Sequence, residues 1–161
     1  MTVTDLLRSA MDAAREREAV IPRMESRREL LGLHGRSGDP ISSGTVLDPM
    51  RQVDEFIDDD SSDSMLLEHL EAELDEAWQV IGGMSELGCD DGAQVCCRHF
   101  LWLESWGEIA RGMGHDEPAC RALMEMTLAW ADGIGVARLR QAALGNRSPV
   151  FPAGNRRWKS K

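Results

Sequence analysis

Cysteine and histidine side chains gather in the second half of the sequence, and thiolate and imidazole groups are the usual ligands of zinc. The group contains Cys89, Cys96, Cys97, His99, His115 and Cys120. Its spacing, C-x6-C-C-x-H, matches no zinc finger or knuckle. Cys96 and Cys120 fall at apolar helix positions, where cysteine is a common small core residue. We therefore predict no metal site, and thiols that stay reduced in a cytosolic protein.

A second candidate is the acidic run Asp58–Asp63, because carboxylates bind calcium. An EF-hand loop that starts at Asp58 needs glycine at its sixth position and glutamate at its twelfth, but the chain has Asp63 and His69 there. The run is interpreted as a solvent-exposed acidic linker. The sequence also contains no nucleophile elbow, phosphate loop or His-Glu metal motif, so we predict neither enzymatic activity nor a cofactor.

Basic side chains near the C-terminus are candidates for contacts with nucleic acid. Arg121 could donate to a guanine edge in the major groove, or it could be an exposed arginine paired with Glu117 or Glu125 four residues away. His115 could contact a phosphate or lie exposed in a turn. The bases after Gly145 could hold phosphates or only keep the chain soluble. The candidate DNA-binding residues are His115, Glu117, Arg121, Ala122, Glu125, Arg147, Arg156, Arg157 and Lys159.

Charge is distributed in blocks along the chain. The net charge is -10, which argues against a protein that coats nucleic acid without sequence preference. Residues 46–91 carry fifteen acids and the single base Arg51, whereas residues 145–161 carry five bases and no acid. DNA contacts must therefore lie outside the acidic block. That block could itself dock on a basic partner surface, so a protein-binding function stays open.

The sequence shows no sign of a membrane segment. No apolar run approaches the roughly 18–20 residues that cross a bilayer. The N-terminal residues are too charged for a signal peptide. We expect a cytoplasmic protein that does not bind membranes.

The first element that must position these residues is a long helix at about residues 4–31. Mostly apolar residues recur at alternating spacings of four and three, as in a coiled-coil seam. The seam contains Val3, Leu7, Ala10, Ala14, Arg17, Ile21, Met24, Arg28 and Leu31. Thr2 or Thr4 can cap its start, and Pro22 could break it near Ile21. Such a narrow seam suits one packing partner, either within the chain or in a homodimer.

A Gly/Ser-rich loop at residues 32–45 separates this helix from the acidic block. Asp48 as cap and Pro49 at the first helical position then predict a new helix to about residue 57. The helix is predicted to bury Met50, Val53 and either Phe56 or Ile57.

After the acidic run, an amphipathic helix is predicted from Ser64 to Ile81, closed by Gly82 and Gly83. Another helix is predicted at about residues 92–103. No β-alternation occurs over a useful length, so the predicted fold class is all-α.

A helix-turn-helix is predicted from Glu104 to about Trp130. Ser105 and Glu108 form a capping box, in which each side chain accepts a hydrogen bond from the other residue's amide. Gly114 can end this short helix in the left-handed conformation. Asp116 then caps a second helix, with Pro118 in its first turn. The buried face of the second helix is predicted to contain Cys120, Leu123, Thr127 and Trp130.

The segment from His99 to Gly114, HFLWLESWGEIARGMG, resembles region 4 of RNA polymerase sigma factors. That region shows an aromatic-ended helix, then S/T-W-x-E-I-A, then L/M-G. The resemblance is closest to small phage and prophage regulators, of the late-gene transcription activator type, that carry a sigma-like C-terminal segment. It implies a helix-turn-helix that contacts promoter DNA or RNA polymerase. The second helix departs from the family pattern, because Arg121 is the only base between Asp116 and Met126.

The sequence therefore predicts three regions. Residues 1–91 form a helical N-terminal region with a flexible loop at 32–45, residues 92–144 form the helix-turn-helix domain, and residues 145–161 form a basic, disordered tail. The predicted function is a phage-type transcriptional regulator that binds double-stranded promoter DNA, RNA polymerase or both. The alternative is an acidic helical protein-binding module, an inhibitor or adaptor, whose helix-turn-helix no longer reads DNA.

Overall fold

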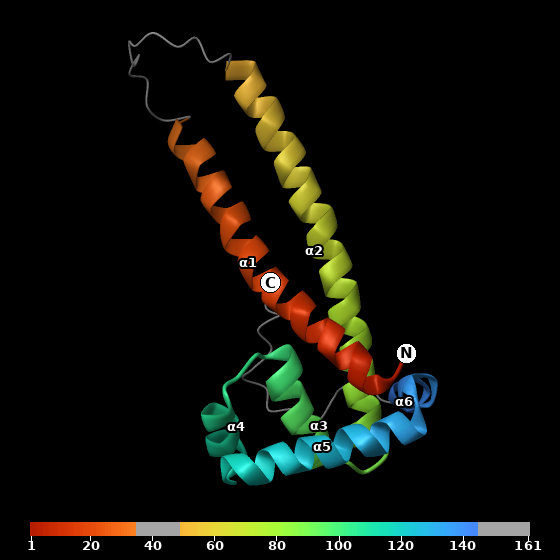
Figure 1. Ribbon diagram of the computed structural model, residues 1–161. Coiled ribbons are helices and arrows are strands. Elements are labelled where there is room, and N and C mark those ends of the chain that lie inside the picture. The colour runs from red at the N-terminus through yellow and green to blue at the C-terminus, as the bar shows by residue number, and fades with distance from the viewer. Residues whose placement is uncertain (35–48, 145–161) are drawn as a thin grey trace.

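The computed structural model describes residues 1–34 and 49–144, and these residues form helices joined by short turns, with no strand among them (Figure 1). The predicted all-α class is confirmed. The elements are α1 (Val3–His34), α2 (Pro49–Glu86), α3 (Asp90–Cys96), the π-helical segment η1 (Cys97–Leu101), α4 (Trp106–Met113), α5 (Glu117–Ile134) and α6 (Val136–Ala143).

The two long helices α1 and α2 lie side by side as a hairpin (Figure 1). Thr2 caps α1, since its hydroxyl accepts a hydrogen bond from the Asp5 amide at 3.0 Å. The apolar seam of α1 packs on α2 of the same chain, which is one of the two predicted alternatives; a homodimer through the seam stays a prediction. The seam residues buried here include Val3, Leu7, Ala10, Ala14 and Met24.

Pro22 does not end α1, which continues to His34. An interior proline removes one backbone hydrogen bond and costs about 3 kcal/mol. Val20 and Met24 on either side of it are buried in the same core as the preceding turns, while Pro22 itself is exposed. Burial on both sides offsets the lost hydrogen bond, so Pro22 does not break the helix near Ile21.

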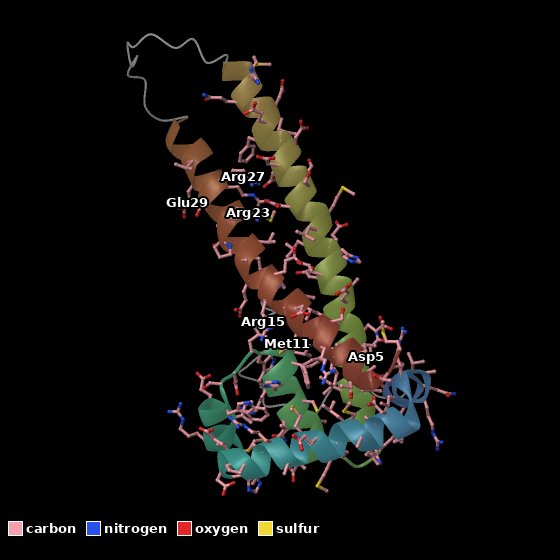
Figure 2. The ribbon with its side chains drawn as sticks, in the orientation of Figure 1. Asp5, Met11, Arg15, Arg23, Arg27 and Glu29 are labelled. Carbon is pink, nitrogen blue, oxygen red and sulfur yellow. The ribbon has the colours of Figure 1, made fainter. Side chains whose placement is uncertain are left out.

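The acidic run at residues 58–63 is helical, so its interpretation as a linker is wrong. The two helices predicted on either side of it are one, α2. Asp63 is 7% exposed and pairs with two arginines of α1, at 2.5 Å from Arg23 and 3.0 Å from Arg27. Figure 2 shows both arginines extending from α1 towards α2. Asp60 pairs in the same way with Arg28 at 3.4 Å. The arginines of α1 neutralise the acids of the run that face α1. Because these charges are neutralised, α2 continues through the acidic run without a break.

The first turns of α2 are not buried as predicted. Met50, Val53 and Ile57 are 66%, 40% and 53% exposed, and Phe56 is half-buried. α1 and α2 diverge towards the ends that flank residues 35–48 (Figure 1). The described part of α1 therefore does not cover this stripe. The expected cap Asp48 and most of the expected loop at 32–45 lie outside the described residues, and residues 32–34 belong to α1.

α2 also runs past Gly82 and Gly83 to Glu86, beyond the predicted end at Ile81. Gly82 and Gly83 do not end α2. They lie where α6 packs against α2. A Cβ on Gly83 would overlap the backbone of Leu139 in α6. α6 was not predicted from the sequence.

The shorter helices gather at the end of the hairpin that carries the N-terminus (Figure 1). One buried cluster draws side chains from α1, α2, α3, η1, α5 and α6, and so continues across the boundary expected between residues 91 and 92. Asp132 of α5 also caps α1, accepting hydrogen bonds from the Thr4 amide at 2.9 Å and the Thr4 hydroxyl at 2.7 Å. α5 is thereby tied to the start of the hairpin.

We predict that Asp63→Asn lowers the free energy of unfolding by roughly 1–2 kcal/mol, because it leaves the largely buried Arg27 and the half-exposed Arg23 without a carboxylate partner. The two arginines lower the pKa of Asp63 from 3.8. The stability that this carboxylate contributes is present above its unfolded-state pKa and is lost as the pH falls through the lower folded-state pKa. Urea titrations of both proteins should therefore show a gap at pH 7 that closes at strongly acidic pH. The exposed neighbour Asp59→Asn serves as control, and an equal loss there would contradict the role of Asp63.

A matched pair of glycine variants tests the α2–α6 contact. Gly83→Ala should cost about 1–3 kcal/mol, the usual range for overpacking, and should speed amide exchange in α6. Gly82→Ala places its Cβ 3.8 Å from the Ala143 Cβ, an ordinary contact. It should stabilise α2 by about 0.5–1 kcal/mol through helix propensity. Thermal melts and hydrogen exchange measure both, and a Gly83→Ala protein as stable as Gly82→Ala would refute the close approach.

Candidate nucleic-acid interface

The short helix α4 begins and ends as the sequence predicts. The Ser105 hydroxyl accepts from the Glu108 amide at 3.3 Å, and the Glu108 carboxylate accepts from the Ser105 amide at 2.8 Å. This confirms the capping box. Gly114 ends α4 with φ 70°, in the left-handed region. Asp116 then caps α5, accepting from the Ala119 amide at 2.8 Å. Three residues thus join α4 to α5, and each predicted signal has its expected role.

A small apolar cluster fixes α4 on α5. Val95 of α3, Ile109 and Ala110 of α4 and Cys120 of α5 are buried together. Thr127 is buried as predicted, but Leu123 is half-buried and Trp130 is 37% exposed. The burial predicted for Trp130 is wrong, because the core contact of the last turns of α5 is made by Ala131 instead.

Arg98 of η1 holds the loop that leads into α4. Its guanidinium bonds the Glu104 carboxylate at 2.8 Å, and both side chains are largely buried. It also lies over the Trp102 ring, 5.5 Å from the centroid. A Cβ on Gly112 would lie 2.5 Å from an Arg98 nitrogen, so a larger residue there would displace the guanidinium from its present position. The Arg98–Glu104 ion pair was not predicted from the sequence, although the two residues lie only six positions apart.

The candidate residues of α5 lie on one exposed stripe. Glu117, Arg121 and Glu125 follow at a spacing of four residues, with Ala122 beside them, and all four are exposed. His115 is exposed in the turn before α5. The helical geometry therefore brings Glu117, Arg121 and Glu125 to one side of α5, with Ala122 next to them. The other candidates, Arg147, Arg156, Arg157 and Lys159, lie outside the described residues.

Arg121 is held by two contacts. Its guanidinium lies 3.7 Å from the Glu117 carboxylate and 5.2 Å from the centroid of the Trp106 ring. The pairing with Glu117 is one of the alternatives that the sequence left open. Trp106 in turn stacks on His99 at 4.7 Å with an interplanar angle of 24°. Burial lowers the pKa of His99, which favours the neutral imidazole in this stack. The sequence motif contains both aromatic residues, but neither their stacking nor the contact of Trp106 with Arg121 was predicted, because both contacts join different helices.

The electrostatic balance of this surface is acidic. Between residues 104 and 130 the chain has five acids and two arginines, Arg111 and Arg121. Glu104 is neutralised by Arg98, but Asp116, Glu117 and Glu125 stay on the exposed side of α5. The described part of the interface therefore offers few phosphate contacts. Residues 145–161 carry five bases and no acid, so they have the highest density of positive charge in this half of the chain.

A groove of about 350 Å³ runs along another flank of α5. It lies between the turn after α2 and α5, and Met126 is 70% exposed at its edge. Its lining is Leu87, Gly88, Cys89, Leu123, Met126, Thr127 and Trp130.

Two cysteines, Cys96 and Cys97, are fully buried. Burial raises the pKa of Cys96 to about 12 and raises the pKa of Cys97 as well, so both thiols are neutral at physiological pH. Over residues 1–34 and 49–144 no group of three or more His, Cys, Asp or Glu side chains is placed to hold a metal ion.

None of the helices that the structure describes is both long enough and apolar enough to cross a membrane. Compared with known proteins, the chain matches no family model, no curated protein and no solved structure.

Proposed function

We propose that this chain is a transcriptional regulator of the phage type, and that α4 and α5 form a sigma region 4-like helix-turn-helix that binds promoter DNA, RNA polymerase or both. The observation that carries the proposal is the exposed stripe at the start of α5. It is presented by a helix whose first turn is capped by Asp116 and whose far end is bonded to α1 through Asp132.

In this reading α5 is the recognition helix. The N-terminal residues of a recognition helix contact base edges while the preceding helix crosses the backbone. Arg121 and its neighbours occupy the second turn of α5, where such contacts are made. Arg111 of α4 is exposed and could reach a phosphate, and the bases after Gly145 would supply further phosphate contacts. The hairpin of α1 and α2 would hold the module on a partner.

The DNA-binding proposal predicts a salt-dependent contribution from the C-terminal bases. Removal of residues 145–161 should make the slope of log K against log salt less steep by about 2–4, because each phosphate contact contributes about 0.9. Fluorescence anisotropy on duplex DNA from the region upstream of the protein's own coding sequence measures this. Arg121→Ala should weaken binding with a slope change of about one or less. Failure of the full chain to bind any duplex at low ionic strength would overturn the DNA-reading version.

A second candidate function is docking of the acidic hairpin on a basic protein surface. Two groups among the acids of α2 differ in their partners. Asp60, Asp63, Glu71 and Glu76 are paired with arginines of α1 and α6, and Glu55 is paired with Arg51 of α2 itself. The acids that remain exposed near the divergent end of the hairpin are Asp54, Asp58 and Asp59. The second group favours a cationic partner, and RNA polymerase or an inhibited enzyme could present one.

Charge reversal tests this second candidate. Replacing Asp54, Asp58 and Asp59 together by lysine should reduce capture of the partner from a host lysate about tenfold or more, as expected when several close charge pairs are reversed. The matched control reverses Glu18, Glu25 and Glu29, which are exposed acids of α1. Both variants change the net charge equally. Equal capture by the two variants would argue against docking through α2.

A further inference from the structure

We propose that Trp106 and Glu117 are positioning residues that hold Arg121 ready to read a guanine in the major groove. This inference rests on the proposed DNA-binding function and goes beyond it. It names the base that the module prefers, and it assigns the preference to a contact between α4 and α5 that the sequence does not reveal.

The contacts of Arg121 restrain the guanidinium. It lies 5.2 Å from the Trp106 ring centroid, within the range of a cation–π interaction. The Glu117 carboxylate lies 3.7 Å from one terminal nitrogen. A guanidinium has five N–H donors, so these two contacts leave donors for a ligand. Arg121 is 55% exposed at its side chain, which leaves it accessible to DNA.

Trp106 is itself fixed by the fold. It is the first residue of α4, directly after the capping residue Ser105. It packs on the buried cluster of Val95, Ile109 and Cys120, and its ring stacks on His99 of η1. The ring therefore has little freedom to move when Arg121 moves. A long side chain that is ordered before binding loses less conformational entropy when its hydrogen bonds form.

The charges around Arg121 indicate that it contributes more to the preference for guanine than to the affinity for DNA. Glu117 offsets its positive charge, so the pair attracts phosphates weakly. The bidentate pairing of arginine with the O6 and N7 acceptors of guanine depends on orientation. Orientation is what Trp106 and Glu117 supply. Loss of either residue should therefore lower the preference for guanine more than the affinity for DNA in general.

Selection from a random duplex library by the full-length protein tests the inference. The wild-type chain should enrich a motif with one dominant guanine, and Arg121→Ala should lose that guanine while keeping the rest. Trp106→Leu should reduce the enrichment of the guanine at least fivefold, the lower end expected for one base-specific contact. Trp106→Phe keeps an aromatic face and should recover most of it. Met113→Ala weakens the same apolar cluster without touching Arg121 and should leave the motif unchanged.

A second pair of variants leaves the core intact. Glu117→Gln and Glu125→Gln each remove one acid from the exposed stripe, but Arg121 is paired with Glu117 and not with Glu125. Both should raise the affinity for unrelated duplexes by a similar factor, since each removes one charge that repels phosphates. Of the two variants, only Glu117→Gln should lower the ratio of the affinity for the selected motif to the affinity for unrelated duplexes.

Replacement of the selected guanine by 7-deazaguanine isolates the N7 contact. The wild-type chain should lose about tenfold in affinity, and Arg121→Ala and Trp106→Leu should lose little. If Trp106→Leu and Glu117→Gln both select the same motif as the wild-type chain, the positioning role is overturned. The proposed DNA-binding function would stand in that case. No enrichment and no retention of any duplex by the wild-type chain would overturn the proposed DNA-binding function and this inference with it.

Discussion

Leu7 and Ala10 of α1 and Leu74, Ala77 and Ile81 of α2 are all but fully buried. Their contact joins the first half of one long helix to the second half of the other, and the remaining elements are built on it. An isolated helix gains little stability in water, so helices of this length depend on packing along one face. α3, η1, α5 and α6 add side chains to the same core. If this contact were lost, the α4–α5 pair would lose the surface that supports it.

The α4–α5 pair is positioned from two directions. Asp132 ties α5 to the start of α1, and Arg98 ties the loop before α4 to η1 through Glu104. Because hydrogen bonds depend on angle as well as distance, these bonds fix the orientation of the α4–α5 pair, which apolar contacts alone do not. The exposed start of α5 is left between these ties. Acids outnumber bases at this exposed start, whereas residues 145–161 carry five bases and no acid.

Features with a local signal could be predicted from the sequence. The Ser105–Glu108 box, the left-handed Gly114 and the Asp116 cap involve neighbouring residues, so residue type and spacing suffice to find them. The acidic run failed for the opposite reason. Six consecutive polar residues favour a linker when the chain is considered alone, but Asp63 faces two arginines from a helix that precedes it by about forty positions. The exposed Trp130 is a similar case, because helical periodicity shows which residues share a face and cannot show which face another helix covers.

The sequence by itself determined the helical class, the caps at the ends of α4 and the start of α5, and the identity of Arg121 as the lone base at that start. These follow from interactions within a few residues, which persist in any fold that contains the segment. The tertiary structure decided that α2 is one helix, that Gly83 admits α6, and that Trp106 of α4 lies against Arg121 of α5. Each of these depends on side chains brought together by packing, and the distances between them are set by the core of the hairpin.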